Sequence, residues 1–120
     1  MNRSDESAPA GFDPAAAKAA GLTVERRGAI ALIGIDRPAK RNALSDPLVR
    51  AIGHAFGALD SPVRAAVLYG HGEHFCAGLD LSALRERSTT EGVLHSMMWH
   101  DAFDAIQFGK VPVIAVLKGA

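Results

Sequence analysis

Three short apolar runs constrain the fold of this chain more than any other feature. Ala29–Ile35 and Val111–Leu117 are almost continuously apolar, and Val63–Tyr69 is a third strand-length segment rich in aliphatic side chains. Continuous runs of this length are typical of strands that are covered on both faces, as in a sheet packed between helices. The sequence therefore predicts a layered α/β protein.

The segments between these runs predict helices. Ser45 is the expected N-cap of one helix, with Asp46 and Pro47 in its first turn. Helical spacing places five apolar side chains on one face of this helix: Leu48, Ile52, Ala55, Phe56 and Leu59. A short helix is expected near 82–87, and a longer one from about 91 to 108.

The predicted elements form one domain with a tail. Leu22–Arg26 alternates and predicts a further strand, so the order is strand, strand, helix, strand, helix, helix, strand. Residues 1–21 mix Ser, Pro, Ala, Gly and charges, which predicts a flexible tail with one short helix over Ala15–Ala20. The domain is expected to occupy residues 22–120.

Charge and cysteine content exclude several classes of protein. Thirteen basic and thirteen acidic side chains balance, so no global field favours nucleic acid or an anionic membrane. Asp5 and Glu6 lie where a secretory signal needs basic residues, and no stretch approaches the roughly 18 apolar residues of a membrane span. The single cysteine, Cys76, fits a reducing compartment. We expect a cytoplasmic protein.

Common catalytic and metal patterns are missing. His71, Glu73, His74 and Cys76 cluster in sequence but match no zinc spacing. The chain contains neither a G-x-S-x-G elbow nor a phosphate-binding glycine loop. We therefore expect no metal and no bound cofactor.

The segment Phe75–Leu81 is the best candidate for chemistry. Gly78 permits a backbone turn that other residues resist, and a turn entering a helix leaves peptide N–H groups unpaired. Such donors suit a carbonyl oxygen that becomes negative during a reaction. The alternative is an ordinary strand-to-helix turn in which Gly78 serves the geometry and Asp80 caps the helix.

This segment resembles the signature of the crotonase (enoyl-CoA hydratase/isomerase) family. Three further segments resemble the same family in the same order: Ile35–Leu44, Val63–Gly70 and Lys110–Gly119. Together they cover nearly everything from Leu22 to Ala120. The resemblance implies a crotonase-like ββα spiral that is incomplete at its C-terminal side, because the family's glycine-rich loop and catalytic acids follow the strand matched by Val111–Leu117. Glu73, Glu86 and Glu91 do not match those acids.

The resemblance also implies a binding site. It places one of two backbone N–H groups that hold the thioester oxygen on Ala77. It places further contacts to the acyl-CoA substrate at Lys40, Arg41, Ala43, Gly78, Leu79, Asp80 and Leu81. Arg37, Lys40 and Arg41 form a local basic cluster, which suits the phosphates of coenzyme A.

Two functions remain open. The first is an acyl-CoA lyase or isomerase, with hydration of an enoyl-CoA as the leading reaction and a thioester enolate stabilised by backbone donors. The second is a non-catalytic, truncated binding or assembly module. The resemblance further implies a homo-oligomer, a trimer or hexamer, for the complete protein, whereas this chain alone is expected to be inactive and to behave poorly in solution.

Overall fold

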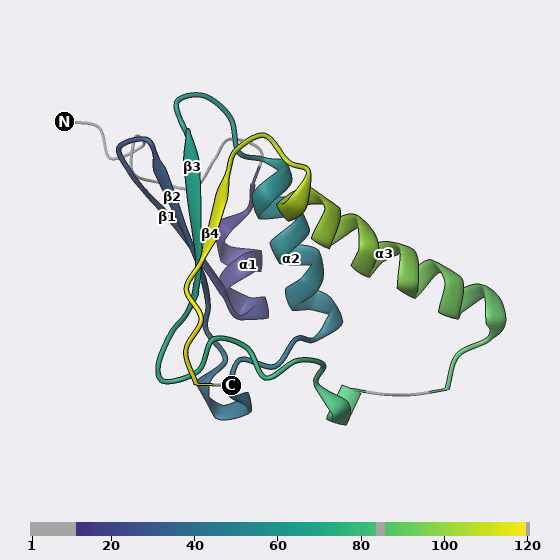
Figure 1. The fold of residues 1–120 in the computed structure, drawn as a ribbon. Helices are drawn as coiled ribbons and strands as arrows, with labels where there is room; N and C mark the ends of the chain where they lie inside the picture. Colours follow the sequence, from purple (N-terminus) through teal and green to yellow (C-terminus); the bar gives the residue numbers. More distant parts are fainter. Residues whose placement is uncertain (1–11, 84–85, 120) are drawn as a thin grey trace.

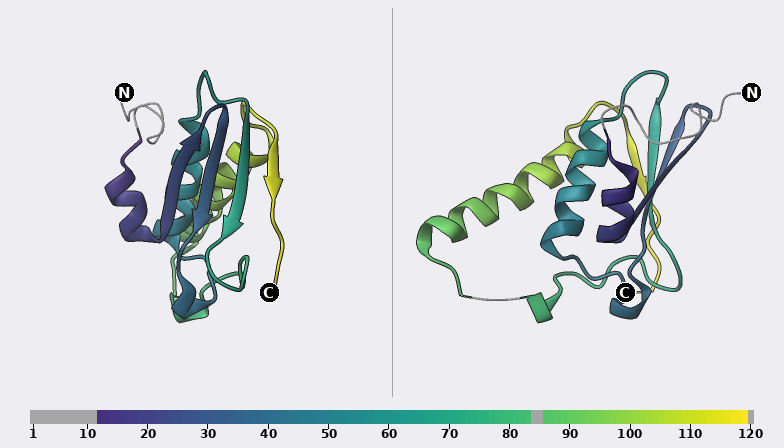
Figure 2. Two further views of the ribbon diagram at one scale, coloured as in Figure 1. Left: turned by 90° about the vertical axis from the view of Figure 1, so that its left-hand side faces the viewer. Right: turned by 180° about the vertical axis from the view of Figure 1, so that it is seen from behind.

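The computed structural model describes residues 12–83 and 86–119 (Figure 1). Its sheet has four strands in the order β1-β2-β3-β4: Leu22–Arg27, Ile30–Ile35, Ala65–Gly70 and Val113–Ala115. β1 is antiparallel to β2, whereas β2, β3 and β4 are parallel. The carboxyl ends of the three parallel strands therefore lie at one edge of the sheet, where the loops that follow them gather (Figure 2).

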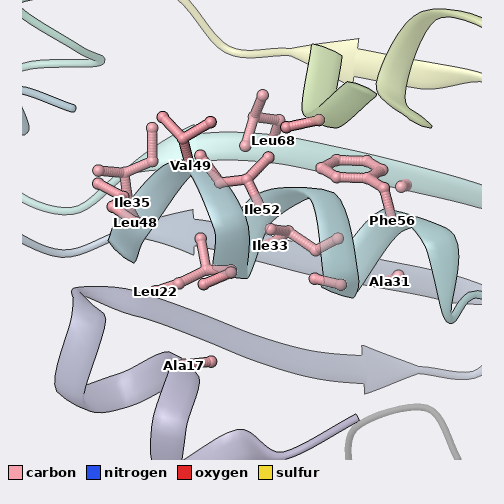
Figure 3. Packing of buried hydrophobic residues seen from close by; sticks show 14 of the residues in the cluster. Ala17, Leu22, Ala31, Ile33, Ile35, Leu48, Val49, Ile52, Phe56 and Leu68 are labelled. Atoms are coloured by element: carbon pink, nitrogen blue, oxygen red, sulfur yellow. The ribbon is translucent and has the colours of Figure 1, made fainter. Parts of the chain in front are cut away.

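Helices cover one face of this sheet. α1 (Pro14–Ala20) and α2 (Asp46–Gly57) lie against the strands, and α3 (Thr89–Gln107) crosses α2 on the outside (Figures 1 and 2). Figure 3 shows the core between sheet and α2, where Leu48, Ile52 and Phe56 face Ile33 and Leu68. The predicted apolar stripe of α2 is thus confirmed as the centre of the core.

Local signals explain where the two long helices begin. The Ser45 hydroxyl accepts a hydrogen bond from the N–H of Leu48 at 3.3 Å, as predicted for the N-cap of α2. α3 begins at Thr89 because Ser88 and Glu91 form a capping box, in which each side chain bonds the other's peptide N–H. The capping box places the start of α3 two residues before the predicted position 91.

Asp46 fastens α3 to the start of α2. Its Oδ1 accepts from Trp99 Nε1 at 2.9 Å and lies 2.7 Å from His95 Nε2, while its Oδ2 pairs with Arg87 at 3.3 Å. Burial acts to raise the pKa of Asp46, but the hydrogen bonds of Trp99 and His95 and the nearby charges outweigh it and lower the pKa. Trp99 therefore has a polar as well as a packing role.

The opposite face of the sheet carries no helix among the described residues. Leu32, Val67 and Ile114 lie side by side on that face, and Ile114 is 61% exposed. The prediction that the apolar strands are covered on both faces is therefore wrong for this structure. β4 also covers only Val113–Ala115 of the predicted strand Val111–Leu117.

Two further predictions need correction. The helix expected at Ala15–Ala20 is present, but Ala17 is buried in the core, so the folded unit includes α1 and residues 12–21 are not a loose tail. The rest of the predicted tail, residues 1–11, lies outside the described residues. In place of the helix expected near 82–87, a 3-10 turn spans Leu81–Ala83, residues 86–88 are not helical, and residues 84 and 85 are not described.

None of the helices in the described ranges combines the length and apolar character that a bilayer crossing requires.

Candidate functional site

The loops that follow β2 and β3 meet at the carboxyl edge of the sheet (Figure 1). Leu44 and Leu79 form an isolated parallel bridge between them. The Leu44 N–H donates to the Gly78 carbonyl at 2.7 Å, and the Asp80 N–H donates to the Leu44 carbonyl at 2.8 Å. The two segments predicted to contact acyl-CoA, 40–44 and 77–81, are therefore side by side, although they are about 35 residues apart in sequence.

Asn42 ties the two loops together. Its side chain is fully buried, and its backbone takes the left-handed conformation with φ of 60°. Its Oδ1 accepts from the Arg37 N–H at 2.7 Å, and its Nδ2 donates to the carbonyls of His71 at 3.0 Å and His74 at 2.7 Å. These bonds join the loop after β2 to the loop after β3, a role that sequence reasoning did not assign to Asn42 beyond its own loop.

Asp80 is buried and paired, so its side chain is not a free ligand. Its Oδ1 accepts from the Ser82 hydroxyl at 2.6 Å and the Ser82 N–H at 3.0 Å, and its Oδ2 pairs with Arg37 Nη2 at 3.0 Å. The Ser82 hydroxyl and the Arg37 guanidinium lower the pKa of Asp80 to about 2. The carboxylate is charged at neutral pH and stabilises the loop.

The structure contradicts the prediction that Ala77 offers a free donor. The Ala77 N–H already donates to the Arg41 carbonyl at 3.1 Å, which is another of the bonds between the two loops. An N–H that is already paired cannot hold a thioester oxygen without breaking this bond. The Ala77 N–H is therefore not available as the oxyanion donor.

The peptide N–H of Leu79 is unpaired among the described residues. In an extended pair, successive residues direct their N–H and C=O groups to opposite sides. Gly78 and Asp80 both bond to Leu44, so the groups of Leu79 point away from it, and its N–H makes no hydrogen bond to any described residue. Gly78, with φ of 92°, supplies the left-handed turn just before it. The Leu79 side chain is itself 42% exposed.

The remaining predicted contacts lie around this donor. Lys40 and Arg41 are exposed, at the end of the 3-10 turn Pro38–Lys40. Ala43 is buried beside the bridge, and Leu81 is exposed. Arg37 differs from its basic neighbours, because its guanidinium is held by Asp80 and by the Ala43 carbonyl.

The other two kinds of candidate site are a metal site and a pocket between helices. No three His, Cys, Asp or Glu side chains come together in a metal-binding arrangement within residues 12–83 and 86–119. A hollow of about 430 Å³ lies between α2 and α3, lined by Leu94, Met97 and Met98 among others, away from the loops at the carboxyl edge.

The sequence of this chain is similar to those of curated enoyl-CoA hydratases. Short-chain-enoyl-CoA hydratase of Clostridium acetobutylicum is 33% identical over 101 residues, which are 82% of this chain and 39% of that protein. Enoyl-CoA hydratase EchA19 of Mycobacterium tuberculosis is 34% identical over 101 residues, covering 80% and 38%. The chain thus spans about two fifths of the length of these relatives.

Solved structures share the fold. A Rhodopseudomonas palustris protein assigned as an enoyl-CoA hydratase superposes with a TM-score of 0.80 at 49% identity, over 90% of this chain and 40% of that one. A Thermobifida fusca protein assigned likewise, solved in complex with CoA, superposes with a TM-score of 0.79 at 25% identity, over 89% and 45%. These likenesses confirm the predicted crotonase-like α/β fold. The enoyl-CoA hydratase/isomerase family model matches residues 25–120, and the chain therefore belongs to that family.

Proposed function

We propose that this chain forms the thioester-binding part of an enoyl-CoA hydratase or isomerase, with the Leu79 N–H donating to the thioester carbonyl oxygen. The observation that carries the proposal is the unpaired N–H of Leu79 at the edge where the loops after β2 and β3 meet. Two further points support it: curated relatives are named enoyl-CoA hydratases, and a structural neighbour was solved with CoA.

The proposed donor acts on charge that develops during the reaction. When water adds to the double bond of an enoyl thioester, its oxygen bonds to C3 while a general base takes one of the water's protons. The π electrons of the C2–C3 bond shift to give an enolate, whose negative charge lies on the thioester oxygen. The resulting enolate then takes a proton at C2. A peptide N–H that is already fixed in place stabilises the enolate with little reorganisation, and one such donor is worth about 10²–10³ in rate. This chain's contribution is to bind and polarise the thioester.

The charged end of the ligand has a matching surface nearby. Lys40 and Arg41 are exposed beside the bridge, and phosphate groups favour such side chains. We place the phosphates of coenzyme A there and the thioester at Leu79. Self-association of the complete protein is part of the same proposal, supported by the exposed apolar residues of the open sheet face and of α3.

The single cysteine permits a direct test of the donor. Cys76 lies three residues before Leu79, so a recombinant segment 1–75 can be ligated to a synthetic peptide 76–120. Replacing the Leu79 amide by an ester removes its N–H and keeps the side chain. The ligand is butyryl-CoA labelled with ¹³C at its carbonyl, which has no double bond to hydrate. The measurements are calorimetric affinity and the ¹³C shift of the bound carbonyl.

The proposal expects a distinct pattern in these variants. The chain with all its amides should bind and shift the carbonyl signal downfield, and the Leu79 ester should lose most of this shift. An ester at Ala77 removes the bond to Arg41 and should lower the melting temperature while keeping the carbonyl shift. If only the Ala77 ester loses the carbonyl shift, Ala77 is the donor and Leu79 is not. If the unmodified chain shows no carbonyl shift, the proposed function is refuted.

A further inference from the structure

Arg37 is held along its whole length. Its backbone N–H donates to Asn42 Oδ1 at 2.7 Å. Its side-chain stem lies against Gly21, the residue that ends α1, where a Cβ would lie 3.0 Å from Arg37 Cδ and closer still to Cγ. Glycine at position 21 therefore leaves the space that the stem occupies. The guanidinium has little freedom to turn toward a ligand.

The guanidinium bridges the two loops of the candidate site. Nη1 donates to the Ala43 carbonyl, and Nη2 donates to Asp80 Oδ2 at 3.0 Å. The side chains of Arg37 and Asp80 are 21% and 8% exposed. A planar guanidinium can hold two acceptors at fixed angles, whereas a lysine ammonium is a single point charge. The positive charge of Arg37 is thus offset by Asp80 rather than offered to phosphate.

These two acceptors flank the bridge that orients Leu79. Ala43 precedes Leu44 in one loop, and Asp80 follows Leu79 in the other. The second oxygen of Asp80 is held by Ser82, so the carboxylate is fixed from both sides. Without the guanidinium, the Asp80 carboxylate keeps only its bonds to Ser82, and the peptide planes on either side of Leu79 keep only their backbone bonds to Leu44. The side-chain link between the two loops is then lost, and the loop that carries Leu79 is less firmly held.

We infer that Arg37 is a positioning residue, which sets the direction of the Leu79 N–H toward the thioester by joining Asp80 to the Ala43 carbonyl. This inference rests on the proposed function. Arg37 then orients the Leu79 N–H, and the phosphate contacts are made by Lys40 and Arg41.

The test separates positioning from stability. Arg37→Gln leaves the buried Asp80 carboxylate without its charged partner, which should lower the melting temperature. The double variant Arg37→Gln with Asp80→Asn removes the unpaired charge, so its melting temperature should recover toward that of the unmodified chain. The ¹³C shift of bound butyryl-CoA should be largely lost in both variants, while affinity for CoA without an acyl group stays within about twofold because Lys40 and Arg41 are unchanged.

Two controls make the outcome decisive. Arg27→Gln removes an exposed arginine at the far end of β1 and should keep both the melting temperature and the carbonyl shift. Arg37→Lys keeps the charge but not the two-pronged geometry, and should restore only a minor part of the shift. A full shift in the double variant would overturn the inference, because the donor would then be oriented without Arg37. Absence of a shift in the unmodified chain would instead overturn the proposed function.

Discussion

Gly70 is where a single added methyl group should separate the two loops of the candidate site. It ends β3 and pairs with Ile35. A Cβ at position 70 would lie 2.6 Å from the Phe75 carbonyl oxygen, 2.8 Å from Asn42 Nδ2, and closer still to the His74 carbonyl oxygen. Two of these atoms are backbone, and the third is the buried amide that joins the loops. None is the free end of a flexible side chain, so Gly70→Ala must move the loop.

The expected cost follows from these contacts. Forcing a methyl group into a packed site typically costs about 1–3 kcal/mol. Displacing the Asn42 amide also weakens its bonds to the carbonyls of His71 and His74, each worth about 1 kcal/mol. The sum is about 3–5 kcal/mol in the free energy of unfolding. For a domain of this size, that corresponds to a fall of roughly 12–20 °C in melting temperature.

The assay is urea and thermal unfolding followed by circular dichroism, with Gly92→Ala as the matched control. Gly92 lies within α3, and a Cβ there would meet nothing within 4 Å. The control should therefore gain about 0.5–1 kcal/mol from higher helix propensity. Amide exchange should also be faster in residues 71–77 of Gly70→Ala. If Gly70→Ala unfolds within about 1 kcal/mol of the unmodified chain, the loop is adjustable and the reasoning about a rigid junction is wrong.

Three further outcomes are expected. The pKa of Asp80 lies at about 2 in the folded chain against 3.8 for a free carboxyl group, so its stabilising effect is present above pH 4 and is lost as pH falls toward 2. In urea titrations, the free energy of unfolding that Asp80→Asn loses should therefore become smaller over that pH range. A loss that stays constant with pH would contradict this reasoning. Trp99→Phe keeps an aromatic ring but removes the donor to Asp46, and should cost about 1 kcal/mol in thermal unfolding; an unchanged melt would show that this bond is not stabilising. Ile114→Lys should reduce self-association in sedimentation velocity because Ile114 is exposed on the open sheet face, an effect that is ruled out if the unmodified chain is already monomeric at high concentration.

Local signals in the sequence predicted most of the elements. Ser45, Asp46 and Pro47 mark the start of α2 because capping and proline preference act within a few residues. The same kind of signal, Ser88 followed by Glu91, marks the start of α3, and the prediction at position 91 came from apolar periodicity instead. The elements were predictable wherever neighbours in sequence decide the conformation.

The layers of the fold were less predictable. A run such as Ala29–Ile35 is apolar on both sides, which indicates that both sides are suited to burial, but it does not identify what covers them. In the structure, Ile33 faces α2 in the core, while Leu32 faces the uncovered side. Periodicity therefore located the strand, and only the three-dimensional arrangement separated its covered face from its open one.

The identity of the free donor depends on contacts that no local pattern contains. The signature segment indicated this loop, but whether a given N–H in it is free depends on Arg41 and Leu44, which are more than thirty residues away in sequence. The Ala77 N–H donates to the Arg41 carbonyl. Leu44 bonds to the Gly78 carbonyl and the Asp80 N–H, so the N–H of Leu79 points away from Leu44. The basic cluster follows the same logic, because Arg37 loses its availability for phosphate only once the sheet brings Asp80 beside it. If the proposed function holds, substitutions in the loop after β2 should therefore change thioester polarisation, although the residues of the donor's own loop are unchanged.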